Sequence, residues 1–169
     1  MNGLTHFDEQ GASRMVDVSG KATTLRTAIA SVLVRMKPAT LALIRDRGLA
    51  KGDVREVARL AGIMAAKRTG ELIPLCHPIG LDAVEIGFAF VDDSTLRIEA
   101  SARTLSRTGV EMEAMTAASI AALTVYDMAK AVDRGITIDA LRLEEKTGGK
   151  SGPFRREPDE ELATKGTDR

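Results

Sequence analysis

The sequence has little of what several classes of protein need. Its 169 residues include one cysteine, two histidines, one tyrosine, four phenylalanines and no tryptophan. One cysteine cannot form an intramolecular disulfide, and with two distant histidines it supplies a dedicated zinc site poorly. Scarce aromatic rings argue against base stacking on single-stranded nucleic acid, and the Pro-Cys-x-x-Cys zinc motif of nucleobase deaminases lacks its second cysteine.

The sequence also lacks a charge excess and a long apolar run. Lysine and arginine number 24, and aspartate and glutamate also number 24. A zero net charge steers the chain toward neither nucleic acid nor membrane, so anion binding requires a local cluster. No signal peptide or membrane-spanning segment is visible. We therefore expect a cytoplasmic protein with no nucleic-acid or membrane partner, large enough for one core.

The order of elements predicts one α+β domain. We expect a flexible amino-terminal arm at 1–20, a single catalytic domain at 21–152 and a flexible charged tail at 153–169. The domain begins with a strand at 24–36, for which a helix is the competing interpretation. The further expected elements are a helix opened by Pro38 and ending near Gly48, a helix capped by Asp53, a hairpin with strands at 84–90 and 96–102, a helix at 110–132 and a strand at 136–143.

This order matches a ferredoxin-like fold, an antiparallel sheet covered on one face by helices, if the helix after Asp53 is an insertion. That helix carries an apolar stripe that we expect to be buried, formed by Val54, Val57, Leu60, Ala61 and Met64. The helix at 110–132 is rich in alanine on one side, which suits packing on the sheet and also helix pairing between subunits.

Four clusters are candidates for chemistry. Cys76 and His77 lie in a short loop between Pro74 and Pro78, which fix the backbone on both sides. Glu111 and Glu113 begin the long helix, where the helix dipole alone favours carboxylates. Asp127 and Lys130, three residues apart near its other end, also suit an ordinary surface ion pair.

The fourth cluster is the glycine-rich segment at 144–152. Gly149-Lys150-Ser151 suggests a phosphate-binding P-loop, but glutamate occupies position 144, where that motif needs glycine, and Pro153 prevents the required helix. What remains is a turn with two lysines that suits phosphate oxygens.

Together the clusters resemble the molybdenum cofactor biosynthesis protein C family, the cyclic pyranopterin monophosphate synthases. The resemblance spans roughly residues 4 to 156. It rests on Leu4-Thr5-His6-Phe7, Arg14-Met15-Val16-Asp17-Val18, Lys67-Arg68-Thr69-Gly70, Leu75-Cys76-His77-Pro78, Thr108-Gly109-Val110-Glu111-Met112-Glu113-Ala114, Tyr126-Asp127-Met128-Ala129-Lys130 and Glu145-Lys146-Thr147-Gly148-Gly149-Lys150-Ser151-Gly152.

The resemblance implies a lyase that converts a cyclised dihydro-GTP to cyclic pyranopterin monophosphate and pyrophosphate. It implies no required cofactor and leaves room for Mg²⁺ bound with the triphosphate. The residues it marks as catalytic are Asp127, Lys130 and Lys51. The residues it leads us to assign to substrate binding are Leu75, Cys76, His77, Glu111, Met112, Glu113, Lys67, Lys146 and Lys150.

Among these we assign proton transfer to Asp127 and Lys130, and recognition of the N–H edge of the base to Glu111 and Glu113. The candidates for binding the triphosphate are His77, Lys67, Lys146 and Lys150. On an unbroken helix Glu113 and Asp127 lie about 21 Å apart. We therefore expect either a broken helix or a pocket shared by two chains, in keeping with the hexamer (a trimer of dimers) that the resemblance implies.

Two other classes stay open at this stage. One is a ferredoxin-like regulator that binds a nucleotide without catalysis, which would not need all of these clusters in one chain. A metal-dependent hydrolase of a GTP-derived ring would need a metal site that the sequence supplies poorly. Adjacent residues of an extended loop point in opposite directions, so Cys76 and His77 suit a pocket wall better than a nucleophile–base pair.

Overall fold

The computed structural model describes residue 6, residues 10–46 and residues 52–157. The predicted catalytic residue Lys51 lies outside these residues, and so does Gly48, where the first helix was expected to end. The elements are β1 (Thr24–Arg35), α1 (Pro38–Arg45), α2 (Val54–Ala66), α3 (Thr69–Leu72), β2 (Ala83–Phe90), β3 (Thr95–Ser106), α4 (Glu111–Ala129), β4 (Thr137–Thr147) and β5 (Phe154–Arg155). The strand interpretation of 24–36 is therefore confirmed, and β5 extends the sheet just beyond residue 152.

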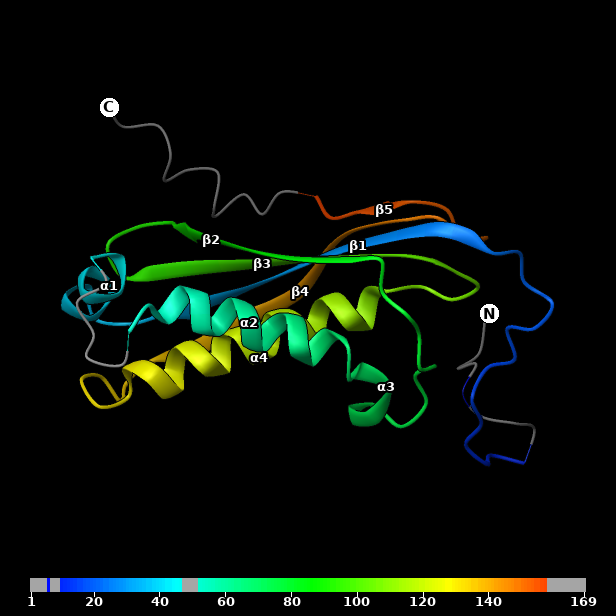
Figure 1. Cartoon of the computed structure of the whole chain (residues 1–169), viewed down its shortest axis with the longest axis horizontal. Coiled ribbons are helices and arrows are strands. Elements are labelled where there is room, and N and C mark those ends of the chain that lie inside the picture. The colour runs from blue at the N-terminus through cyan, green and yellow to red at the C-terminus, as the bar shows by residue number, and fades with distance from the viewer. Residues whose placement is uncertain (1–5, 7–9, 47–51, 158–169) are drawn as a thin grey trace.

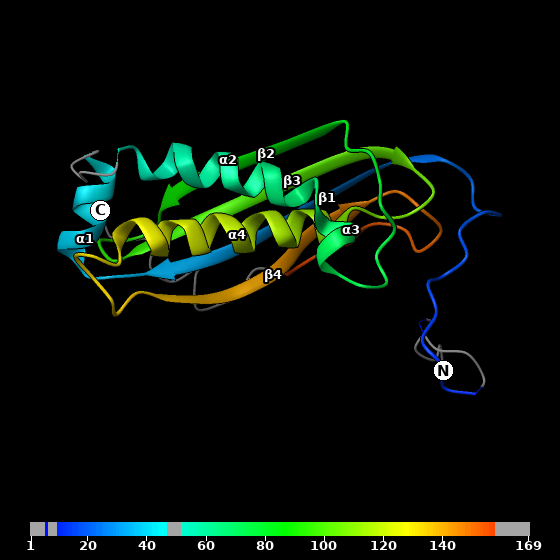
Figure 2. The same ribbon diagram turned by 60° about the horizontal axis from the view of Figure 1, so that its bottom comes forward.

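The strands form one antiparallel sheet in the order β2-β3-β1-β4-β5. Helices α2 and α4 lie side by side on one face of it (Figures 1 and 2). In the central strands β1 and β3, successive side chains point to opposite faces of the sheet. On the face covered by the helices, β1 buries Ala28, Ala30, Val32 and Val34. The α+β, ferredoxin-like architecture predicted from the sequence is confirmed.

The hairpin and the long helix also follow the prediction. Ser94 donates its backbone N–H to Asp92 Oδ1 at 2.8 Å in the turn between β2 and β3. Helix α4 runs without a break from Glu111 to Ala129. Its buried side is formed by small residues, among them Ala114, Ala117 and Ala121. These alanines pack within the protein, so they are not left over for pairing with another subunit.

The prediction for the buried face of α2 is wrong for most of the stripe, although Val54 is buried as expected. The stripe residues Val57, Leu60 and Met64 are 44%, 59% and 47% exposed, whereas Ala58, Gly62 and Ala65 are buried. The reason is the close approach of α2 to α4, since a Cβ on Gly62 would lie 2.9 Å from the Ala117 carbonyl oxygen. Small side chains are needed there, and the larger apolar ones face outward.

The assignment of α2 as the inserted helix is wrong as well. Helix α2 packs against α4 and β2, as the first helix of a ferredoxin-like fold does. The additional helix is α1, at the end of the sheet (Figure 2). Its start is held by buried Asp133, which accepts the Lys37 backbone N–H at 2.9 Å and the Thr40 hydroxyl at 3.2 Å.

Candidate active site

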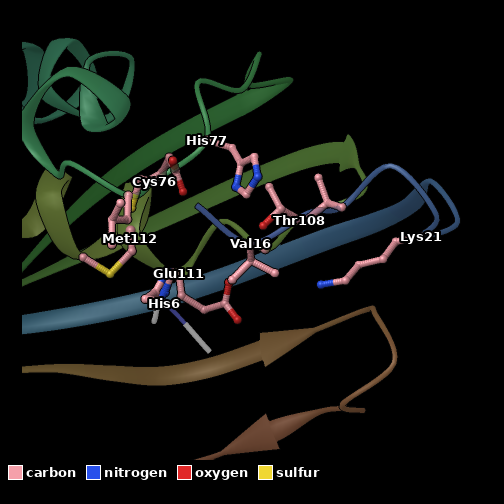
Figure 3. A pocket seen from close by; sticks show the side chains of 12 residues that line it. His6, Val16, Lys21, Cys76, His77, Thr108, Glu111 and Met112 are labelled. Carbon is pink, nitrogen blue, oxygen red and sulfur yellow. The ribbon is translucent and has the colours of Figure 1, made fainter. Parts of the chain in front are cut away.

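A pocket of about 390 Å³ lies where the start of α4 meets the loop after α3 (Figure 3). This volume falls within the range of small-molecule sites. Six residues assigned to substrate binding from the sequence line it, namely Leu75, Cys76, His77, Glu111, Met112 and Glu113. The fold therefore brings together two motifs that are more than thirty residues apart in the chain.

The rest of the pocket wall was missed by the sequence analysis. His6, Val16, Val18 and Lys21 come from the segment before β1, and Thr108 and Gly109 from the connection between β3 and α4. Three signals for them were present, because 4–7, 14–18 and 108–114 are among the segments that carry the family resemblance. The apolar Val16 and the basic Lys21 give the wall both an apolar surface and a positive charge (Figure 3).

The loop that carries Cys76 and His77 is fixed by close packing. The Cys76 backbone N–H donates to the Ile73 carbonyl at 3.0 Å, just after α3. A Cβ on Gly70 would lie 3.1 Å from Pro78 Cα, so the two ends of the loop touch. Both Cys76 and His77 line the pocket, but within the described residues no hydrogen bond joins them.

The Cys76 thiol is held in its neutral form. Burial raises its pKa, and the negative charge of Glu113 raises it further. A thiol with a raised pKa is a poor nucleophile at neutral pH. The geometry and the charge thus agree with Cys76 as part of the pocket wall.

Glu113 is the most perturbed acid in the pocket. Glu113 lies in the first turn of α4 and is 3% exposed. Burial raises the pKa of its carboxyl to about 7, with a further contribution from the charge of Glu111. An acid with this pKa exchanges a proton readily near neutral pH.

Glu111 faces the pocket and also contacts the sheet. Its Oε1 lies 3.3 Å from Nζ of Lys146 on β4. A Cβ on Gly109 would lie 1.8 Å from Glu111 Oε2, so the glycine leaves the room in which the carboxylate sits. Lys146 is thereby placed next to the pocket, while Lys150 is exposed in the turn after β4.

Lys67 lines a second cavity of about 250 Å³ beside the first. Glu113 borders both cavities and so separates them. Thr69, Gly70 and Pro78 form part of the same wall. The predicted triphosphate ligand Lys67 is therefore close to the pocket without lining it.

Asp127 and Lys130 are not part of this pocket. Lys130 Nζ donates to Asp127 Oδ1 at 2.6 Å, and the side chains of Lys130 and Asp127 are 50% and 61% exposed. This hydrogen bond raises the pKa of Lys130. Because α4 is unbroken, Asp127 lies about 21 Å along the helix from Glu113.

The described part of the chain offers neither a metal-binding cluster nor a membrane-spanning helix. In residues 6, 10–46 and 52–157, no three His, Cys, Asp or Glu side chains form a group able to hold a metal ion. Over the same residues, no helix is both long enough and apolar enough to span a bilayer.

Comparison with known proteins identifies the family. Residues 15–149 match the MoaC family. Cyclic pyranopterin monophosphate synthase 1 of Mycobacterium tuberculosis is 61% identical over 153 residues, 90% of each chain. The cyclic pyranopterin monophosphate synthase of Thermomicrobium roseum is 60% identical over 161 residues, 95% of this chain and 97% of that protein. That of Novosphingobium aromaticivorans is 59% identical over 155 residues, 92% of this chain and 98% of that protein. The chain belongs to the MoaC family.

Proposed function

We propose that this protein is a cyclic pyranopterin monophosphate synthase. It is a lyase that converts (8S)-3',8-cyclo-7,8-dihydroguanosine 5'-triphosphate to cyclic pyranopterin monophosphate and pyrophosphate in molybdenum cofactor biosynthesis. The observation that carries the proposal is the pocket, which gathers Cys76, His77, Glu111 and Glu113 in a chain about 60% identical to proteins of that name.

The two carboxylates recognise the base. Guanine and pterin rings present adjacent N–H donors on one edge, and ionised carboxylates only accept hydrogen bonds. Glu111 and Glu113 lie one helical turn or less apart at the start of α4, and both line the pocket. With a pKa of about 7, Glu113 is also suited to take up or release a proton as the rings open and close.

Lysine side chains and the imidazole of His77 hold the triphosphate. His77 lines the pocket, Lys146 contacts Glu111, and Lys67 lies in the adjoining cavity. To these and Lys150 we add Lys21, which lines the pocket from the segment before β1. Positive charge at this end of the molecule stabilises the phosphate oxygens and the departing pyrophosphate.

Asp127 and Lys130 carry the proton transfers of the rearrangement, and they reach the substrate from a second copy of the chain. Lys51, which lies outside the described residues, is the third catalytic residue of the proposal. The unbroken α4 supports this arrangement, because a single nucleotide does not span about 21 Å within one subunit. The outward-facing Val57, Leu60 and Met64 support association, since they form an apolar stripe on α2. We assign the assembly as a homohexamer, a trimer of dimers, with sites at subunit interfaces.

The reaction needs no protein-held redox cofactor, because proton transfers and one phosphoryl displacement involve no net oxidation. Any Mg²⁺ accompanies the triphosphate. We assign the enzyme to the cytoplasm, and a GTP-derived substrate supports this assignment. Activity that persists in chelator would separate this enzyme from a metal-dependent hydrolase.

The test is incubation of the purified protein with the cyclised dihydro-GTP, followed by assay of pyrophosphate and of the pterin product. Both products should appear together. A protein that binds the substrate and releases neither product would instead be a nucleotide-binding regulator, and the proposal would fail.

A further inference from the structure

The glycine-rich turn between β4 and β5 is built against β1. Gly148 and Gly149 have φ values of 84° and 81°, which favour glycine. A Cβ on Gly148 would lie 2.2 Å from the Leu25 carbonyl oxygen, and one on Gly149 would lie 2.0 Å from the guanidinium of Arg26. The turn is closed by Gly152, which donates its N–H to the Gly149 carbonyl at 3.3 Å. The position of Ser151 is thus set by the fold.

Ser151 contacts a lysine of the candidate site. Lys146 Nζ donates to Ser151 Oγ at 2.7 Å. Lys146 is paired with Ala28, whose side chain is buried beneath the helices, so both side chains point to the helix-covered face of the sheet. This orientation brings the ammonium to Glu111 at the pocket, with 21% of the lysine side chain exposed.

The two contacts of Lys146 differ in quality. The 2.7 Å to Ser151 is a full hydrogen bond, whereas the 3.3 Å to Glu111 exceeds the 2.7–2.9 Å that is typical of a charge-assisted one. An ammonium has three N–H donors, and among the described residues these contacts account for two. The serine therefore holds the lysine back from full pairing with Glu111, and one donor is left for a ligand.

We infer that Ser151 is a positioning residue for the triphosphate. By holding the Lys146 ammonium, it keeps one N–H available to phosphate oxygens and leaves the Glu111 carboxylate available to the N–H edge of the base. Without the serine hydroxyl, the flexible lysine would settle on Glu111, and each would neutralise the other. This inference rests on the proposed function, because it assigns Lys146 and Glu111 to the same substrate.

Substitution of the hydroxyl tests the role. Ser151→Ala should raise KM for the cyclised dihydro-GTP about three- to tenfold, the effect of one lost hydrogen bond, with kcat within about twofold of the wild type. Ser151→Thr keeps the hydroxyl and should restore KM. Ser94→Ala is the matched control, since it removes a hydroxyl from the other hairpin turn, where Ser94 Oγ contacts only Asp92 among the described residues. All variants should melt within a few degrees of the wild type.

A role through Lys146 predicts non-additivity. In a Lys146→Met background, Ser151→Ala should have no further effect on KM. Binding of inorganic pyrophosphate, measured by calorimetry, needs no turnover and should weaken in parallel with KM in Ser151→Ala. Wild-type KM and pyrophosphate affinity in Ser151→Ala would overturn the inference, as would a full effect in the Lys146→Met background. If pyrophosphate binding follows the prediction but no product forms, the proposed function fails while the positioning role stands.

Discussion

Glu113 and Asp127 lie on one unbroken helix, about 21 Å apart along its axis. Glu113 is buried in the pocket wall, whereas Asp127 is paired with Lys130 on the exposed surface near the other end of α4. The proposed recognition residues and the proposed acid–base residues of one subunit therefore lie at opposite ends of α4. Under the proposed function, two copies of the chain bring them to one substrate.

Asp127→Asn should lower kcat about 10²- to 10⁴-fold, because it removes the carboxylate to which we assign proton transfer. Its ion pair with Lys130 is exposed, so stability should change by less than about 1 kcal/mol. Asp139→Asn is the control, since Asp139 forms a similar exposed pair with Arg35 at 2.8 Å. Steady-state kinetics and thermal melting separate the two effects. An active Asp127→Asn enzyme would remove this residue from the mechanism.

Cys76→Ser should keep kcat within about tenfold of the wild type. The thiol lines the pocket with a raised pKa, so it contributes shape and not a thiolate. A covalent mechanism would instead lose activity by several orders of magnitude. Turnover of the serine variant, with intact-mass analysis of the wild type during turnover, distinguishes the two. A substrate adduct on Cys76 would contradict the account.

Glu113→Gln should change the pH dependence of stability. In the folded state the pKa of this carboxyl is raised from 4.5 to about 7. Its contribution to the free energy of unfolding is therefore fully present below about pH 4.5 and is lost as the pH rises through about 7. The shift corresponds to roughly 3 kcal/mol. Glutamine stays neutral, so the variant should be more stable than the wild type above pH 7 by up to this amount. Urea unfolding from pH 4.5 to 8 measures it, and parallel curves for both proteins would exclude the raised pKa.

Gly62→Ala should destabilise the protein by about 1–3 kcal/mol, because the added methyl would press on Ala117 and Ile86 where α2 crosses α4. Gly80→Ala is the matched control, since a Cβ there meets no atom within 4 Å. The free energy of unfolding in urea provides the comparison. Equal stability of the two variants would show that the helices separate without cost.

The sheet and α4 were predictable because their signals are local. Apolar residues alternate along β1 and β3, and this pattern can be read from near neighbours in the chain. The same is true of the turn formed by Asp92 and Ser94. The buried face of α2 was not predictable from hydrophobicity. Its orientation is set by the need for small residues such as Gly62 against α4, which is a long-range constraint.

The candidate site shows the same division. The loop at Cys76 and the carboxylates at Glu111 and Glu113 were visible as motifs, and the fold brings them together. The contribution of Lys21 was hidden, because this lysine lies between the 14–18 segment of the family resemblance and the start of β1, and no motif includes it. The contact of Lys146 with Glu111 depends on strand register, which places the lysine on the helix-covered face.

The shared site can be measured directly by complementation. One inactive variant carries Glu111→Gln and Glu113→Gln, and the other carries Asp127→Asn. In a mixed pair of subunits, one of the two sites combines native carboxylates from one chain with native Asp127 from the other. Co-expressed variants, purified as mixed oligomers, should therefore regain turnover of the cyclised dihydro-GTP that neither parent shows. Mixed oligomers as inactive as their parents would contradict a site built from two subunits.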